Sequence, residues 1–200
     1  MSDGALRRSE RRQREHSATR SAILEAARRV AEREGARDLS LRAVAAEAGF
    51  APAALYGYFD GKDELLLSLA ADDLSQLARA MRGASAGLEG KGRFAAAASA
   101  ALALLRTTET FAAASSALPK SAGTSEAERL FNGRLISALK ALSDAAGHEA
   151  ESRDGQCDVL LVASALSGLA LLARAGRLEA LGFKPEEILG RLATLFAKDA

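Results

Sequence analysis

The chain has 200 residues, 48% of them hydrophobic, and its 27 Lys and Arg residues almost balance 26 Asp and Glu residues, leaving a formal charge of +1. This length suffices for one domain or two small ones with a core, and the balanced charge excludes a uniformly basic nucleic-acid-binding protein but not a local basic patch. Because Cys157 is the single cysteine, an intrachain disulfide and a cysteine-rich metal site are excluded, which agrees with a reducing cytoplasm.

Composition also predicts the fold class. Alanine is abundant, β-branched residues are few, and the chain has only 3 prolines and 4% aromatic residues. Strong helix formers therefore dominate, and no stretch alternates apolar and polar residues long enough for a sheet. The first residues lack the apolar stretch of a signal peptide, and the longest apolar run, about 15 residues from Val159 to Ala173, is shorter than the roughly 20 of a membrane span. We expect an all-α, cytoplasmic protein without a membrane partner.

The chain opens with a basic segment. Residues 1–17 have no repeating hydrophobic face, so we expect a flexible, disordered arm there. Its arginines are interleaved with two glutamates, and they are Arg7, Arg8, Arg11, Arg12 and Arg14. Such an arm is either a solvated tail or a segment that lies along phosphate or in a minor groove.

Three helices follow at a spacing typical of a helix-turn-helix. A helix over Ala18–Glu34 ends at Gly35, a second begins after Ser40, a good N-cap, and a third spans about Pro52–Phe59. Gly49 lies in the intervening turn, where a positive φ is commonly needed. Such a unit places its third helix in a major groove. Three packed helices without a ligand are the alternative interpretation of the spacing alone.

The remaining pattern is also helical. A long helix begins near Asp60, and the glycines at 83, 87, 90 and 92 indicate a loose connection after it. Ser125 and Glu128 form a capping-box pattern for a helix that reaches about residue 146. Further helices are expected over 94–106, 107–118 (ended by Pro119), 157–175 and 185–198, about nine in all. We divide the chain into the arm (1–17), the helix-turn-helix unit (18–65) and a larger helical part (66–200).

Residues Thr19 to Leu66 resemble the DNA-binding domain of the tetracycline-repressor (TetR) family of bacterial regulators. The match is ungapped over about the first third of the chain. The matching residues are Ile23-Leu24-Glu25-Ala26-Ala27, Gly35, Leu39-Ser40-Leu41-Arg42, Val44-Ala45, Ala48-Gly49-Phe50, Leu55-Tyr56, Tyr58-Phe59 and Lys62-Asp63-Glu64-Leu65-Leu66.

The resemblance implies a set of DNA contacts. Phosphate contacts are implied for Tyr56 and Lys62, and a mixed phosphate and base role for Ser40 and Arg42. The full expected set is Ser40, Arg42, Ala51, Pro52, Ala53, Tyr56, Gly57, Tyr58 and Lys62. For both tyrosines core packing is the alternative, and we expect Phe50, Leu55 and Phe59 in the core.

Two residues depart from the family pattern. Ala54 replaces a residue that is usually glycine, serine or threonine, and Gly57 replaces a bulkier side chain beside Tyr56. The third expected helix therefore offers few hydrogen-bonding groups to base edges. Its alanine methyl groups can contact thymine methyls, and Arg42 can supply a polar contact. Much of the specificity is left to DNA shape and to the arm.

The resemblance further implies that the last two helices of each subunit form a four-helix dimer interface. A helix that is apolar nearly all round needs burial on every side, although an internal core helix is the alternative interpretation. The expected interface residues are Ser164, Ala165, Ser167, Gly168, Leu189, Leu192, Leu195 and Phe196.

A ligand pocket is implied between the DNA-binding domain and the dimer interface. Few charges interrupt this region, so it would suit a small apolar or amphipathic effector, although ordinary core is the alternative for each residue. The expected lining residues are Phe94, Leu102, Leu105, Thr108, Phe111, Phe131, Leu135 and Leu169.

No pattern of catalytic or metal-ligating residues is present in the sequence. His16 and His148 lie far apart without neighbouring carboxylates, and we expect Cys157 to be a buried, inert thiol. We therefore expect no cofactor, no metal and no enzyme activity. The prediction is a homodimeric, TetR-like repressor that binds a palindromic operator and is released by a small apolar effector. An all-α enzyme and a helical scaffold that retains the fold are the alternatives.

Overall fold

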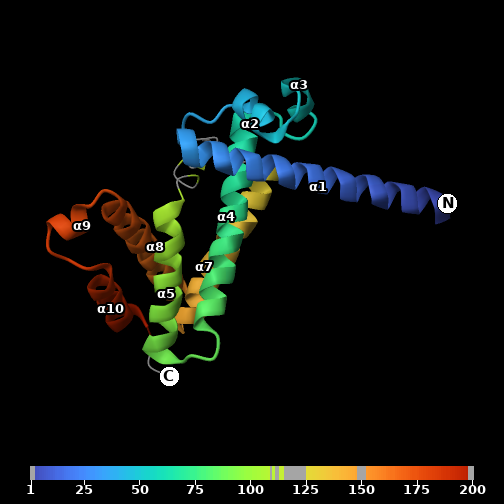
Figure 1. Ribbon diagram of the computed structural model, residues 1–200. Helices are drawn as coiled ribbons and strands as arrows, with labels where there is room; N and C mark the ends of the chain where they lie inside the picture. The colour runs from blue at the N-terminus through green and yellow to red at the C-terminus, as the bar shows by residue number, and fades with distance from the viewer. Residues whose placement is uncertain (1–2, 109, 111–112, 115–124, 148–151, 198–200) are drawn as a thin grey trace. The chain divides into compact units, whose positions relative to one another are not determined.

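The computed structural model describes residues 3–108, 110, 113–114, 125–147 and 152–197, and within these ranges every regular element is a helix, which confirms the all-α prediction (Figure 1). The helices are α1 (Asp3–Glu34), α2 (Leu41–Ala48), α3 (Pro52–Leu55), α4 (Lys62–Ser85), α5 (Gly90–Thr107), α7 (Glu126–Ala146), α8 (Arg153–Arg174), α9 (Arg177–Ala180) and α10 (Pro185–Phe196). The short α9 was not expected. Most of the helix expected over 107–118 lies outside the described residues, as do Phe111, Pro119 and His148.

The chain divides into two compact units. The first comprises Met1–Ala70 together with Glu109–Glu128, and the second comprises Ala71–Thr108 together with Arg129–Ala200. The first division thus falls a few residues beyond the expected boundary after residue 65, and a later segment is added to the first unit. The expected capping box of α7 is present, because Glu128 N donates to Ser125 Oγ at 3.2 Å and Ser125 N donates to the Glu128 carboxylate at 3.4 Å.

The core of the first unit is built on one face of α1. The residues of this face are small or medium-sized and include Ile23, Ala26 and Val30, all fully buried. Small side chains let neighbouring helices approach closely, and α2 packs directly on α1. Leu55 and Phe59 are buried as expected, whereas Phe50 is 37% exposed, which corrects the expectation that it belongs to the core.

Capping residues determine where α2 begins and ends. Ser40 accepts a hydrogen bond from Ala43 N at 3.2 Å and so caps the first turn, as its residue type predicts. Gly49 follows the last turn with φ 75°, in the left-handed region, and its N–H bonds back to the carbonyls of Ala45 and Ala46. The chain therefore turns sharply after α2, which confirms the expected helix-turn-helix connection.

The third helix is shorter than expected. Regular α-helix covers only Pro52–Leu55, and the chain then continues as a turn in which Gly57 N bonds to Ala54 O at 3.2 Å and Tyr58 N to Leu55 O at 2.9 Å. These bonds span three residues rather than four, as in a tightened last helical turn. The weak helix propensity of Gly57 accounts for this early ending.

The basic segment at the start of the chain also differs from expectation, because it is helical from Asp3 onward. It continues α1 without a break to a total length of 32 residues. Arginine, glutamate and glutamine are strong helix formers, and no proline interrupts this stretch. Arg14 pairs with Glu10, and Arg11 with Glu15, one helical turn away in each case and both at 3.5 Å, which adds support along the exposed face.

In the second unit α5 packs against α8, and α10 packs against both. One face of α8 is buried, with Val162, Leu166 and Leu169, while the other is exposed and carries Leu161 and Leu171. Among the described helices α8 alone is long and apolar enough, by length and composition, to span a membrane, and 33% of its apolar window is buried within the chain; one such helix is weak evidence for a membrane span. Cys157 is exposed, so the expectation of a buried thiol is wrong.

Two glycine substitutions test the backbone geometry. Gly49→Ala forces a Cβ into a left-handed conformation, so we expect the free energy of unfolding to fall by about 1 kcal/mol. Gly57→Ala is the matched control: φ is not positive there, a Cβ would lie 3.4 Å from Ala54 O, and we expect a gain of about 0.4–1 kcal/mol. Urea titration measures both, and equal losses in the two variants would contradict this explanation.

Candidate nucleic-acid interface

Most residues expected to contact DNA lie on the surface of the first unit. Their exposure follows from the core, because Val44, Ala45 and Leu55 turn one side of α2 and α3 inward and leave the opposite side outward. Tyr56, just beyond α3, is 60% exposed. The exposed members of the expected set are Ser40, Arg42, Ala51, Pro52, Ala53, Tyr56 and Gly57.

This surface combines one guanidinium group, two hydroxyl groups and several small apolar groups. Arg42 is exposed in the first turn of α2, two residues after the Ser40 cap, and α3 begins at Pro52 with Ala51 as its N-cap. A guanidinium group can bind phosphate or a guanine edge, and a tyrosine hydroxyl can donate to phosphate. With little polar bulk on α3, its backbone can approach a ligand closely.

Tyr58 is placed differently from Tyr56. It is half-buried, packs on the core of the first unit and stacks on His16 of α1, with ring centroids 4.6 Å apart and an interplanar angle of 25°. Of the two tyrosines, Tyr56 is therefore the one whose hydroxyl-bearing ring is mostly available to a partner.

Lys62 already has an intramolecular acceptor. Its ammonium group donates a hydrogen bond to the backbone carbonyl of Arg37, in the segment before α2. The half-buried lysine therefore ties the first turn of α4 to that segment. A phosphate contact by Lys62 would require the ammonium group to share or exchange this acceptor.

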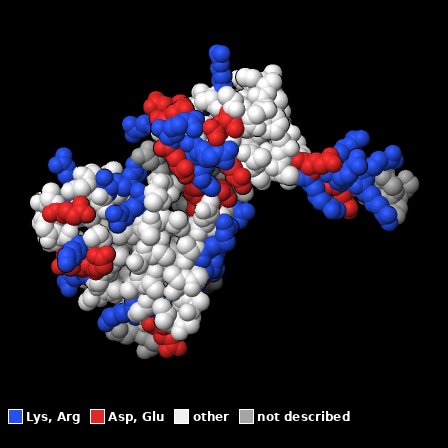
Figure 2. Space-filling model, in the orientation of Figure 1, with Lys and Arg blue, Asp and Glu red and all other residues white. Residues whose placement is uncertain are grey.

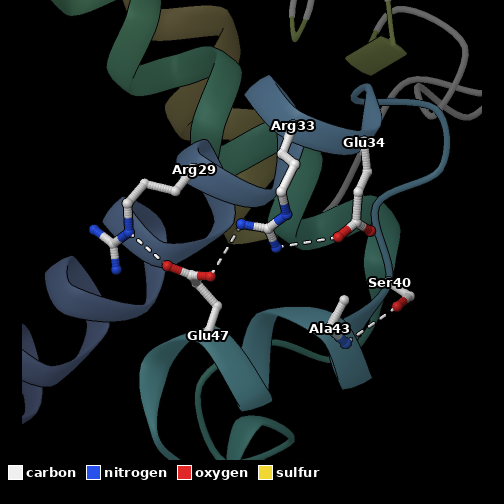
Figure 3. Close-up of polar contacts among 6 residues, drawn as sticks. All are labelled: Arg29, Arg33, Glu34, Ser40, Ala43 and Glu47. Carbon is white, nitrogen blue, oxygen red and sulfur yellow. Dashed lines mark hydrogen bonds and ion pairs between the residues drawn. The ribbon is translucent and has the colours of Figure 1, made fainter.

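A second group of charged residues joins α1 to α2 and was not predicted. Glu47 accepts from Arg29 Nε at 2.7 Å and from Arg33 Nη1 at 3.2 Å, and Arg33 also bonds to Glu34 at 3.1 Å (Figure 3). The guanidinium hydrogen bonds, that of Arg29 first and that of Arg33 second, hold the pKa of Glu47 below its ordinary value of 4.5. We call Glu47 with its two partners, Arg29 and Arg33, the clamp; it pairs both arginines within the protein.

The sequence indicates that the two arginines of the clamp lie on one helix face, but not that Glu47 is their partner. Arg29 and Arg33 lie four residues apart and so share one face of a helix, which the spacing reveals. Their partner on α2 depends on how α1 and α2 cross. Helical periodicity does not specify that angle.

The residues expected to line a ligand pocket are in the second unit, except for Phe111. Phe94, Leu102, Phe131 and Leu169 are buried, whereas Leu105, Thr108 and Leu135 are partly exposed. None of them lines the hollow of about 410 Å³ that lies between α7 and α8. The residues lining that hollow are Ile136, Leu139, Lys140, Ser143, Gln156, Val159 and Leu160.

The expected dimer residues divide into three groups. Leu189 and Leu192 are buried within the chain, where they pack α10 into its own unit, and Ala165 and Phe196 are half-buried. The exposed members are Ser164, Ser167, Gly168 and Leu195. Within the described ranges no group of three or more His, Cys, Asp or Glu residues is arranged to hold a metal ion.

The comparisons with known proteins agree with this geometry. Residues 23–69 match the family model of bacterial regulatory proteins, tetR family. A TetR transcriptional regulator from Rhodococcus sp. RHA1 shares 22% identity at a TM-score of 0.67, with 91% of this chain and 97% of that chain covered. A TetR family transcription regulator from Marinobacter aquaeolei VT8 shares 20% identity at a TM-score of 0.62, with 94% and 100% covered.

A third structure is that of the transcriptional regulator FadR from Bacillus subtilis in complex with stearoyl-CoA. It shares 18% identity at a TM-score of 0.62, and the comparison covers 90% of this chain and 98% of that chain. No curated protein matches the chain. The three structures share the all-helical fold of this chain. The similarity to the tetR family of bacterial regulatory proteins therefore covers residues 23–69, within the first compact unit.

The clamp generates a pH-dependent prediction. Because the folded-state pKa of Glu47 lies below 4.5, its stabilising effect is fully present above pH 4.5 and is lost as the pH falls through that lowered pKa. Glu47→Gln should therefore lower stability at pH 7 and leave a smaller difference from wild type in acid. Urea titrations across pH 3–7 measure this.

Glu15→Gln is the matched control, since Glu15 pairs with Arg11 only within the exposed face of α1. We expect little effect from it at any pH. A loss in Glu47→Gln that is constant from pH 7 to pH 3 would contradict the role of the carboxylate charge.

Proposed function

We propose that this protein is a transcriptional repressor that binds a palindromic operator as a homodimer and is released by a small effector with a large apolar part. The observation that carries the proposal is the exposed surface of α2 and α3, within the segment that matches the family. Arg42 and Tyr56 supply its hydrogen-bonding groups, and the alanines beside Pro52 supply methyl groups for thymine contacts.

The contacts divide by chemistry into those that position and those that specify. Ser40, at the α2 N-terminus, and the hydroxyl of Tyr56 suit phosphate oxygens, which set register without reading sequence. Arg42 suits a base edge, with guanine as its commonest partner. Because α3 offers few polar groups, the shape of the operator contributes much of the remaining specificity.

The exposed face of α8 supports a homodimer. Leu161, Ser164, Gly168 and Leu171 follow one another at steps of three, four and three residues, which is the spacing of a helix–helix seam, and all four are exposed. Small residues at the centre of such a seam allow close approach. Two copies are required because one unit reads half a site, and paired half-sites lie about 34–36 Å apart.

The second unit supports binding of an amphipathic effector. The hollow between α7 and α8 combines four apolar side chains with the ammonium group of Lys140, which suits an apolar chain with an anionic end. The FadR structure from Bacillus subtilis contains stearoyl-CoA, a ligand of this general chemistry. Release requires that the effector prefer the state with lower operator affinity, without dissociating the dimer.

The proposed role also assigns a function to each part of the chain. Residues 18–65 read DNA, residues 66–200 bind the effector and the second copy, and the protein acts in the cytoplasm without a cofactor or catalytic step. A helical scaffold that retains the fold is the second candidate, and the salt dependence of DNA binding separates the two.

The first test is selection of bound duplexes from randomised and genomic DNA, followed by salt titration of the selected duplex. We expect a palindrome and a logarithmic affinity that falls linearly with the logarithm of salt concentration. Tyr56→Phe should weaken binding about tenfold on every sequence, because it removes one hydrogen bond to a charged group and leaves the exposed ring in place.

Arg42→Ala should instead relax preference at one position of each half-site. Uniform weakening across sequences would reassign Arg42 to phosphate. If no duplex is enriched and no salt dependence is found, the scaffold interpretation replaces the regulator.

The dimer is tested with Leu171→Asp, at a position that is 65% exposed in the single chain. A buried carboxylate at the seam should shift the protein to a monomer in sedimentation velocity, without loss of helical content. Leu88→Asp, at a position 45% exposed on the α4–α5 connection, is the control and should remain dimeric. A Leu171→Asp protein that sediments like wild type would place the interface elsewhere.

A further inference from the structure

The N-terminal half of α1 does not take part in the core of its unit. All side chains from Arg7 to Ala18 are exposed, and the first fully buried residue after them is Ile23. Figure 1 shows this half of α1 extending beyond α2 and α3. A helix of this length without a packed face is only marginally stable in water, so burial does not explain the segment.

Charge is what distinguishes the segment. Residues 7–20 contain six arginines against two glutamates, a net charge of +4, whereas the whole chain carries +1. Figure 2 shows the Lys and Arg side chains gathered over this end of α1, with fewer acidic ones among them. Arg11 and Arg14 pair with Glu15 and Glu10 only within the helix, and exposed pairs of this kind exchange readily for a stronger anionic partner.

Two contacts join the C-terminal end of this segment to the residues that follow α3. His16 stacks on Tyr58, and the Arg20 guanidinium lies 4.7 Å from the centre of the Phe59 ring while donating to Ser68 Oγ at 2.8 Å. Tyr58 and Phe59 follow α3 directly. The exposed, basic part of α1 therefore begins next to the residues that follow α3.

The reach of the segment follows from helix geometry. At about 1.5 Å per residue, Arg12 lies roughly 6 Å and Arg8 roughly 12 Å beyond His16 along the helix. Phosphates on one DNA strand advance by about 3.4 Å each along the axis, so this stretch passes about three of them.

We propose that residues 7–14 of α1 bind the phosphate backbone of the DNA that flanks each half-site, outside the segment contacted by α2 and α3. This inference rests on the proposed function. The arginines Arg7, Arg8, Arg11, Arg12 and Arg14 extend the interface outward and neutralise phosphates without reading sequence. The affinity for DNA should therefore depend on the length of the flanking DNA and not on its sequence.

The segment lacks the side chains that a lipid surface or a second helix would require. A helix lying on a lipid surface requires a large apolar face, and a second helix requires an apolar seam. Between Arg7 and Thr19 the residues other than arginine and glutamate are small or polar, namely Ser9, Gln13, His16, Ser17 and Ala18. The segment thus offers charge alone, which complements a polyanion.

The test uses two variants of the full chain, each with five substitutions. In the first, Arg7, Arg8, Arg11, Arg12 and Arg14 are replaced by glutamine, which keeps helix propensity and removes the charge. In the second, the same residues are replaced by lysine, which keeps the charge. Both are titrated with salt on the duplex selected by the wild-type protein, once with ten flanking base pairs at each end and once trimmed to the palindrome.

On the flanked duplex the glutamine variant should bind at least tenfold more weakly, with a salt slope lower by about two units per protomer. The lysine variant should match the wild type. On the trimmed duplex all three proteins should bind alike, because the flanking phosphates are absent. Circular dichroism and sedimentation confirm that helicity and oligomeric state are equal among them.

Three results would overturn the inference while leaving the proposed function intact. These are an unchanged salt slope in the glutamine variant, equal weakening on trimmed and flanked duplexes, and a change of oligomeric state that identifies the segment as a self-association surface. Failure of the wild-type protein to select any duplex would instead overturn the proposed function, and this inference with it.

Discussion

A four-residue helix is not stable on its own in water, so the exposed surface of α2 and α3 depends on two buried side chains, one at the end of α3 and one four residues later. Leu55 and Phe59 are buried in the core of the first unit, and Tyr56 and Gly57 between them are exposed. Gly49 supplies the other half of the constraint, because its left-handed backbone redirects the chain after α2. Exposure of Tyr56 is a consequence of these buried side chains, since the residue lies on the opposite side of the same turn.

The distribution of charge explains how a chain of formal charge +1 can present a basic surface. Glu47 engages Arg29 and Arg33 between α1 and α2, which keeps two positive charges within the protein. Those arginines stabilise the angle at which the two helices cross. Exposed positive charge in the first unit includes Arg42 and the arginines at the start of α1. The net charge of the chain therefore does not show where a basic surface lies, because that depends on the position of each charged residue.

Much of the first unit could be predicted from sequence, because its features are local. Ser40 as a cap, Gly49 in a turn, and the burial of Leu55 and Phe59 each follow from residue type and spacing over a few positions, and the structure confirms them. The family resemblance is confirmed over residues 23–69. The roles of individual residues in contacting DNA stay predictions.

What could not be predicted depends on balances between weak effects or on tertiary geometry. The first 17 residues have no hydrophobic face but strong helix propensity and internal ion pairs, and the structure continues α1 through them from Asp3. The end of α3 reflects the single weak helix former Gly57. Phe50 was assigned to the core because it is large and apolar, yet it is exposed beyond the turn, since the direction of a side chain after a left-handed residue is not readable from its type.

The helix α8 shows the same limit at the level of assembly. Its apolar residues cover nearly the whole circumference, and sequence cannot distinguish the face that meets its own unit from the face that meets another molecule. The structure separates them: Val162, Leu166 and Leu169 are buried in the chain, and Leu161 and Leu171 are not. For α10 the expected interface residues Leu189 and Leu192 belong to the inner face. An apolar stripe left exposed in the single chain is costly in water, and the proposed second copy would lower that cost by covering Leu161 and Leu171.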